Sequence, residues 1–218
     1  MKLLLTSAGI TNESIADALS ELVGKPLSQV NAGFIVTAKN NRGIPAEEAM
    51  SAQIEQLNYR GINYRLVDPS EHSNWRELLE SVELVIIGGG NTFHLLNEVR
   101  KTGFDTWLEE NKRSKVFMGT SAGSIVMTPD ISIAAVDNGD ENTPGITNMT
   151  GLCLINFELS PHTPENVSIS ANLEYSKSTE RRILLMDNNS ALSVTNEGWV
   201  IITEGCTRWC QSGQEITN

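Results

Sequence analysis

The sequence predicts an α/β protein built around a mainly parallel sheet that is covered by helices on both faces. Short apolar runs alternate along the chain with stretches whose apolar residues recur every three or four positions, the spacing of a helix that buries one face. The apolar runs are continuous rather than alternating, which is typical of strands buried on both sides. Strands and helices in this alternation favour a parallel sheet between two helix layers.

The first half of the chain supplies most of the expected sheet. Strands are expected at residues 3–6, 33–37, 64–67, 84–87 and 116–118. Helical stripes lie between them at residues 15–22, 46–57, 75–82, 92–99 and 107–108. Gly24, Gly61 and Gly103 are expected to end three of these helices, and Asn74 and Thr92 to cap the starts of two.

The second half begins with a segment of different composition. Residues 137–148 are rich in Asn, Asp, Gly, Thr and Pro, which predicts a surface loop. Apolar runs at 152–159 and 183–186 predict two more strands, and runs at 191–194 and 199–202 around a turn predict a hairpin. The tail from Cys206 is polar and is expected to pack loosely. Without a repeat or a linker, residues 1–218 are expected to form a single domain.

Charge and cysteine content exclude several classes of protein. The 218 residues carry 27 acidic and 16 basic side chains, a net charge of −11, which argues against nucleic acid or an anionic membrane surface as the main partner. Three cysteines are too few for a disulfide scaffold and lack the second pair that a zinc site needs. No apolar run approaches the ~18 residues of a membrane span. We therefore expect a cytoplasmic protein, monomeric or homodimeric, without a metal.

The strongest chemical motif is Gly119-Thr120-Ser121-Ala122-Gly123, which matches G-x-S-x-G. It lies between an expected strand and a helix-like run, where a tight turn would lift the Ser121 hydroxyl above the sheet. A helix N-terminus there would favour a developing oxyanion, and the N–H of Ala122 would point at it. These features predict Ser121 as a nucleophile.

A second glycine-rich turn precedes the first. Gly88-Gly89-Gly90-Asn91-Thr92 also lies between a strand and a helix, so both turns should open on the same edge of a parallel sheet. Its backbone N–H groups could bind an oxyanion or a carboxylate, and Gly89, Gly90 and Asn91 are candidate binding residues. A phosphate-binding loop is the weaker interpretation, because the segment lacks both G-x-G-x-x-G and a following Lys-Ser/Thr.

A serine nucleophile needs a base, and the chain has three histidines. His72 lies in a polar loop and His94 in a helix after the glycine turn. His162 follows an expected strand end in Ser160-Pro161-His162, so it can reach the same edge as Ser121, and it is the predicted base.

A third group must orient the imidazole. Asp187, at the end of the strand at 183–186, is the first candidate. Asn188 could orient the ring but could not offset its charge. Asp137, Asp140 and Glu141 lie in the polar loop between Ser121 and His162 and remain alternatives.

Four segments now resemble one family. Residues 88–93 (GGGNTF), 119–124 (GTSAGS), the run from Gly151 to His162, and 187–192 (DNNSAL) occur in the order of the S51 serine peptidases, which include peptidase E (aspartyl dipeptidase) and cyanophycinase. The resemblance implies a flavodoxin-like three-layer α/β/α sandwich, similar to class I glutamine amidotransferases. It implies Ser121 as nucleophile, His162 as base, and oxyanion donors near Gly90 and at Ala122.

The resemblance also shows a departure. The family has a glutamate where this chain has Asn188, with Asp187 one residue earlier. The sequence is closer to the peptidase E-like branch than to the aspartyl dipeptidases proper, so a requirement for N-terminal Asp is not implied. Lys177, Arg181 and Arg182 follow the histidine and could recognise carboxylates, although a solvated helix face is the favoured interpretation.

The leading hypothesis is a serine exopeptidase that acts on small peptides without a metal or an organic cofactor. Asn188 favours an alternative, a catalytically weak or inactive module of the same fold that binds small molecules or peptides. An α/β-hydrolase esterase would need its acid between Ser121 and His162 and a histidine beside the glycines, which is absent. An amidotransferase would have Cys in place of Ser121.

Overall fold

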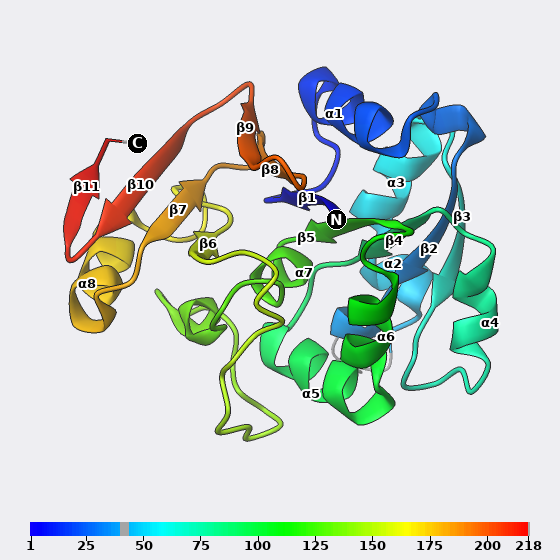
Figure 1. Cartoon of the computed structure of the whole chain (residues 1–218). Helices are drawn as coiled ribbons and strands as arrows, with labels where there is room; N and C mark the ends of the chain where they lie inside the picture. The colour runs from blue at the N-terminus through cyan, green and yellow to red at the C-terminus, as the bar shows by residue number, and fades with distance from the viewer. Residues whose placement is uncertain (40–43, 218) are drawn as a thin grey trace.

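The larger of two sheets forms the centre of the molecule (Figure 1). A computed structural model describes residues 1–39 and 44–217, and within them this sheet has seven strands in the order β3-β2-β4-β5-β1-β8-β9. Strands β1 to β5 are parallel, and β8 and β9 extend one edge in antiparallel pairing. The strand bounds are β1 Lys2–Thr6, β2 Asn31–Ile35, β3 Asn63–Val67, β4 Leu84–Ile87, β5 Val116–Thr120, β8 Ser190–Val194 and β9 Trp199–Thr203.

Two apolar cores cover the two faces of this sheet. Neighbouring residues of one strand enter different cores: Leu3 and Leu5 of β1 belong to one and Leu4 to the other. The first core includes apolar residues of α4 to α7, and the second includes those of α1 and α3. This arrangement confirms the three-layer α/β/α fold, because every strand residue of β4 and β5 is buried.

The helices follow the expected alternation. Their bounds are α1 Glu13–Val23, α2 Ala46–Ala49, α3 Ser51–Tyr59, α4 Trp75–Glu80, α5 Thr92–Thr102, α6 Phe104–Asn111, α7 Ala122–Ile125 and α8 Ile169–Thr179. The stripe expected over 46–57 is thus divided between α2 and α3 at Met50.

Two expected helix caps were wrong. The side chain that caps α5 belongs to Asn91, whose Oδ1 accepts a hydrogen bond from the His94 N–H at 2.8 Å, and Thr92 is the first helical residue. Asn74 does precede α4, but its side chain makes no capping hydrogen bond.

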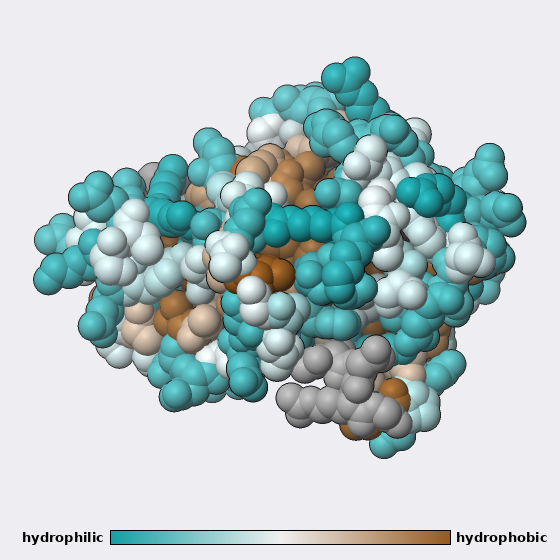
Figure 2. Space-filling model, turned by 90° about the horizontal axis from the view of Figure 1, so that it is seen from below, coloured by the Kyte–Doolittle hydropathy of each residue, from teal (hydrophilic) through white to brown (hydrophobic). Residues whose placement is uncertain are grey.

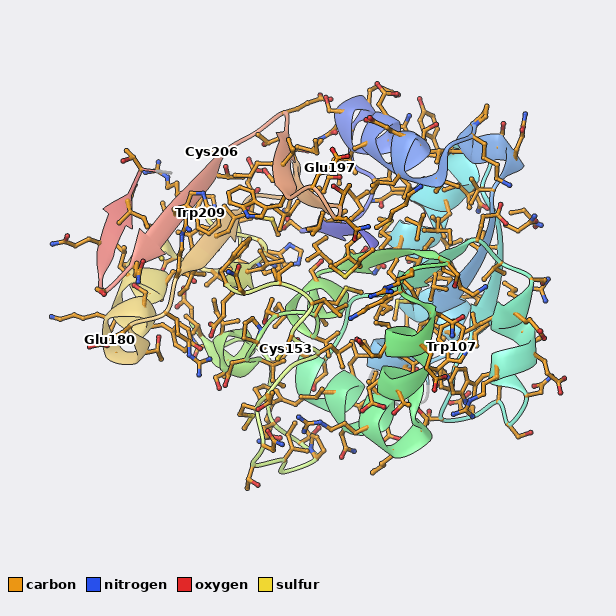
Figure 3. All side chains as sticks on the ribbon, in the orientation of Figure 1. Trp107, Cys153, Glu180, Glu197, Cys206 and Trp209 are labelled. Atoms are coloured by element: carbon orange, nitrogen blue, oxygen red, sulfur yellow. The ribbon has the colours of Figure 1, made fainter. Side chains whose placement is uncertain are left out.

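A second sheet stands beside the first and corrects the prediction for the tail. Its order is β11-β10-β7-β6, and its members are β6 Glu158–Ser160, β7 Ile183–Met186, β10 Thr207–Gln211 and β11 Gln214–Ile216. The tail from Cys206 was expected to pack loosely, but β10 pairs with β7 (Figure 1), with Trp209 on it as Figure 3 labels. Trp209 and Cys210 are buried. The run at 152–159 is also mostly loop, because pairing with β7 begins only at Glu158.

Trp209 holds this second sheet against the rest of the chain. Its ring lies 4.8 Å from Phe157 and 5.4 Å from Trp199, measured between ring centroids, and the guanidinium of Arg182 stacks on it at 4.1 Å. Replacing Trp209 by alanine is expected to lower the free energy of unfolding by about 3–5 kcal/mol. Urea denaturation followed by circular dichroism measures this loss.

The matched control is Val200→Ala, because this apolar side chain of β9 is 61% exposed. Its effect should stay within about 0.5 kcal/mol. Equal unfolding midpoints for Trp209→Ala and Val200→Ala would show that the tail contributes nothing to the fold.

The surface is mainly hydrophilic on the face that Figure 2 shows, with apolar residues gathered in a central strip. Among the helices of the described residues, none is both long enough and apolar enough to cross a membrane.

Candidate active site

Ser121 occupies a strained turn between β5 and α7. Its backbone has φ 53° and ψ −114°, a left-handed φ that costs a residue with a side chain on the order of 1–3 kcal/mol. The flanking glycines are required by close packing. A Cβ on Gly119 would lie 2.6 Å from the carbonyl oxygen of Gly123, and one on Gly123 would lie 2.0 Å from that of Ile87. The turn therefore has the geometry expected of G-x-S-x-G.

His162 reaches Ser121 from the end of β6. Its Nε2 lies 2.9 Å from the Ser121 Oγ. The backbone of His162 is also held in a left-handed conformation, with φ 59°, and its N–H donates to the Ser7 Oγ at 2.8 Å. The structure thus brings together the predicted nucleophile and the predicted base, which are contributed by different sheets.

Asn188 is the partner of the other ring nitrogen. Its Oδ1 lies 2.6 Å from His162 Nδ1. An amide oxygen can only accept a hydrogen bond, so in the neutral imidazole Nδ1 carries the proton and Nε2 can accept the proton of the Ser121 hydroxyl. The backbone N–H of Asn188 donates to Glu165 Oε1 at 3.0 Å, which fixes the turn that carries the amide.

Among the described residues, Asp187 makes no hydrogen bond to the His162 ring, which corrects the first candidate for the orienting acid. Its carboxylate is buried and turned toward the chain after β9, where Oδ2 accepts from the Cys206 N–H at 2.5 Å. Oδ1 accepts from the Asn189 N–H at 3.0 Å and the Ser190 hydroxyl at 2.6 Å. Asp187 thus shapes the turn on which Asn188 is presented.

The loop acids do not orient the ring either. Asp137 accepts from the Ser168 N–H and Asp140 from the Thr92 N–H, both at 2.7 Å, and the Glu141 side chain is exposed. In residues 1–39 and 44–217, the hydrogen bonds of the His162 ring go to Ser121 and Asn188 alone.

The glycine turn lies against Ser121 as expected. A Cβ on Gly89 would lie 3.3 Å from the Ser121 Cβ, and Gly90 has φ 137° and approaches Ala38 so closely that a Cβ would lie 1.9 Å from its carbonyl oxygen. Ala122 is the first residue of α7, where a backbone N–H has no partner within the helix. The side chain of Asn91 is committed to structure: it caps α5 and donates to the Glu141 carbonyl at 2.8 Å.

Two pockets meet at the Ser121–His162 pair. Both are lined by Gly90, Ser121 and His162. The first has a volume of about 250 Å³ and continues between β6 and the loop around residues 133–140. The second has a volume of about 320 Å³ and continues toward Lys39, Met50 and Gln53. A scissile bond placed over Ser121 would therefore have space for the substrate group on each of its two sides.

The remaining histidines lie outside this arrangement. His72 Nδ1 accepts from the Asp68 N–H at 3.1 Å and stabilises a loop, and His94 lies in α5. Within the described part of the chain, no three His, Cys, Asp or Glu side chains gather as a metal site.

A family model described as peptidase family S51 matches residues 3–202. The chain belongs to peptidase family S51. Known relatives of this S51 chain include an uncharacterized peptidase of Pasteurella multocida, 29% identical over 122 residues that span 55% of this chain and 59% of that protein. An uncharacterized peptidase of Listeria monocytogenes is 34% identical over 85 residues, 38% of this chain and 42% of that protein. A peptidase E of Shewanella amazonensis is 31% identical over 104 residues, 47% and 43% of the two chains.

Two crystal structures resemble the S51 chain over nearly its whole length, whereas the matched segments span three-fifths or less of these curated relatives. One is a Listeria monocytogenes protein with a proposed peptidase E identity, with a TM-score of 0.75, 24% identity, and coverage of 94% of this chain and 98% of that chain. The other is a peptidase from an acI-B1 Actinobacterium, with a TM-score of 0.71, 16% identity, and coverage of 100% and 96%. At these identities the likeness shows the fold.

Asp187 is expected to matter for stability rather than for chemistry in this S51 chain. Replacing it by alanine leaves the Cys206 N–H and the Ser190 hydroxyl without their acceptor, so the free energy of unfolding should fall by at least about 2 kcal/mol. The kcat/KM of the folded variant should change less than about tenfold. Urea unfolding and peptide hydrolysis of the same sample measure the two effects. A hundredfold loss of kcat/KM at unchanged stability would restore Asp187 as the orienting acid.

Proposed function

We propose that the protein is a serine-type exopeptidase that hydrolyses short peptides through a covalent acyl-enzyme. The observation that carries this proposal is the contact of 2.9 Å between Ser121 Oγ and His162 Nε2, with Nδ1 held by Asn188 at 2.6 Å. A nucleophile, a base and a group that orients the base are the parts that acyl transfer requires. Membership of a peptidase family supports the same reaction class.

The reaction would proceed in two halves. Ser121 Oγ attacks the peptide carbonyl carbon as its proton passes to His162 Nε2, and backbone N–H groups at Gly90 and Ala122 bind the resulting oxyanion. The C–N bond breaks when His162 returns the proton to the leaving amine. Water, deprotonated by His162, then attacks the ester carbonyl, and the acid product leaves as Ser121 recovers its proton.

Asn188 stands at the position of the group that orients the base, where it offers an amide dipole instead of the charge of a carboxylate. An amide oxygen keeps Nδ1 protonated and the ring aimed at Ser121, which a carboxylate would also do. It offsets less of the positive charge that the imidazolium gains when it takes the Ser121 proton. We therefore expect a slower enzyme than one with a carboxylate at this position.

The pocket volumes support a short substrate. Spaces of about 250 and 320 Å³ on the two sides of Ser121 lie near the lower end of the range of about 300–1,000 Å³ for small-molecule pockets. One or two residues on each side of the cleaved bond would occupy them.

A panel of peptides tests this proposal. Free dipeptides and tripeptides are expected to be hydrolysed, with release of free amino acids, whereas N-acetylated dipeptides and internal bonds of decapeptides should be cleaved at least tenfold more slowly. Simple esters serve as the comparison for an esterase. Rapid hydrolysis of esters without hydrolysis of any free peptide would contradict the peptidase assignment.

Asn188 also favours a second candidate, a member of the same fold that binds peptides or small molecules and turns them over weakly or not at all. The two candidates separate in one measurement. Saturable binding of a dipeptide without release of amino acids over a day would support the binding module, whereas release that follows Michaelis–Menten kinetics would support the enzyme.

A further inference from the structure

The two pockets beside Ser121 differ in the charge of their walls. Asp137 and Asp140 line the first, and within the part of the chain that the structure describes no Lys or Arg does so. Lys39 lines the second, where no carboxylate of the described residues joins it, but its ammonium is paired outside that lining with Asp68 at 3.8 Å and Glu71 at 3.3 Å. A peptide laid across Ser121 therefore meets two carboxylates on one side and, on the other, an ammonium that two carboxylates already pair.

Both carboxylates of the first pocket are held in place by backbone N–H groups. Asp137 Oδ2 accepts from Ser168 and Asp140 Oδ2 accepts from Thr92, each at 2.7 Å. The bonds from Ser168 hold the pKa of the Asp137 carboxyl below its ordinary value, so this side chain is ionised at neutral pH. In each carboxylate these bonds engage one oxygen and leave Oδ1 for a ligand.

Thr92 adds an independent sign that the first pocket takes a ligand. Its side chain is fully buried and lines the pocket, yet its hydroxyl oxygen has no hydrogen-bond partner among the described residues. A buried hydroxyl without a partner costs free energy that a ligand can recover. An ammonium group has three donors, which the Thr92 hydroxyl and the carboxylate beside it can accept.

The basic side chains that follow His162 in sequence do not line the first pocket. Arg181 is paired with Asp130 and with Glu158, and together these residues line another pocket. The Arg182 guanidinium stacks on Trp209, and Lys177 is exposed on α8. An acidic side chain in the first pocket would face Asp137 and Asp140, and no Lys or Arg of the described residues lines that pocket to pair with it.

We propose that the first pocket binds the N-terminal residue of the substrate and selects a basic one, Lys or Arg, against an acidic one. In this orientation the α-ammonium and the basic side chain face Asp137, Asp140 and the Thr92 hydroxyl, while the carboxylate of the leaving residue lies in the second pocket, away from these two carboxylates. The reverse orientation would place like charges together on the acidic side. The assignment of the scissile bond rests on the proposed function, whereas the preference of the pocket for a cation can be measured without turnover.

Binding to the Ser121→Ala variant tests the preference. Calorimetric titration with Lys-Leu, Leu-Leu and Asp-Leu is expected to give a Kd at least tenfold lower for Lys-Leu than for Asp-Leu, with Leu-Leu between them. Adding Asp137→Asn and Asp140→Asn should reduce that ratio to threefold or less, because asparagine keeps an acceptor for the backbone N–H groups but loses the charge. Glu141→Gln is the matched control: it removes a neighbouring exposed charge that does not line the pocket and should leave the ratio unchanged.

Asp-Leu binding as tightly as Lys-Leu, or a Lys preference that survives both asparagine substitutions, would overturn the proposal, as would the absence of binding by every peptide at 10 mM. If the double variant unfolds, Asp137→Asn alone replaces it, since this side chain is exposed, and 1 M NaCl should reduce the wild-type ratio. Hydrolysis by the wild-type protein separates the two proposals. A Lys preference in binding without hydrolysis would contradict the peptidase proposal and support the preference of the first pocket. Hydrolysis without that preference would support the peptidase and contradict the preference.

Discussion

Replacing Ser121 by alanine is expected to lower kcat for hydrolysis of an accepted dipeptide by at least about 10³-fold while KM changes little. The hydroxyl supplies the bond-forming oxygen, and the residual rate would come from the oxyanion donors and substrate positioning alone. His162→Gln should lose a similar factor, because Nε2 is the base for that oxygen. The double variant should be no slower than either single variant, since the two side chains act as one unit.

The measurement is release of free amino acids, with circular dichroism to confirm the fold of each variant. Ser193→Ala, on β8, is the control and should retain full activity. Ser121→Ala with more than a tenth of the wild-type kcat would exclude Ser121 as the nucleophile.

Replacing Asn188 by aspartate is expected to raise kcat at least tenfold at pH 8. A carboxylate 2.6 Å from His162 Nδ1 would stabilise the imidazolium formed in the transition state, which the amide of the natural chain cannot do to the same extent. It also favours the protonated ring in the resting enzyme, so the acid limb of the profile of kcat/KM against pH should move to higher pH. Asn188→Ala removes the group that orients the ring, and kcat should fall at least tenfold.

Asn189→Asp is the matched control for Asn188→Asp. It adds the same charge one residue later on an exposed side chain that does not contact His162. Its kcat and its pH profile should remain within about twofold of the wild-type values. Equal effects of the two aspartates would mean that long-range charge, and not the contact with the ring, governs the rate.

The sequence predicted the Ser121–His162 geometry because both residues follow strand ends. The carboxyl ends of parallel strands lie at one edge of a sheet, and the glycines of the motif leave one conformation for the turn, so the position of Ser121 follows from local rules. The same logic predicted His162 at this edge, but the strand that ends at Ser160 belongs to the second sheet, so the contact with Ser121 depends on how the two sheets meet.

Local sequence rules could not predict whether Asp187 or Asn188 orients the His162 ring, because the answer depends on a contact with a distant part of the chain. Successive side chains at a strand end point to opposite sides. A difference of one residue in the alignment therefore changes which side chain is expected to point at His162. The Asp187 carboxylate is held by the Asn189 N–H, the Ser190 hydroxyl and the Cys206 N–H, and the last of these comes from the chain after β9. The tail was expected to pack loosely, so no partner for Asp187 was expected there.

Asn91 shows a similar limit. Its position in the glycine turn predicted a binding role, but an asparagine before a helix is also an N-cap, and the structure uses its oxygen for that purpose. A short polar side chain at this position fits both a binding role and an N-cap. The contact with the 137–148 loop distinguishes the two interpretations.

The most direct test of Ser121 as an activated nucleophile is intact-mass spectrometry after reaction with a fluorophosphonate, followed by peptide mapping. We expect one adduct, on the peptide that contains Ser121, absent from Ser121→Ala and formed at least tenfold more slowly by His162→Gln. A folded protein that takes up no adduct, or one that takes it up equally without the Ser121 hydroxyl, would contradict a serine-type active site in this fold.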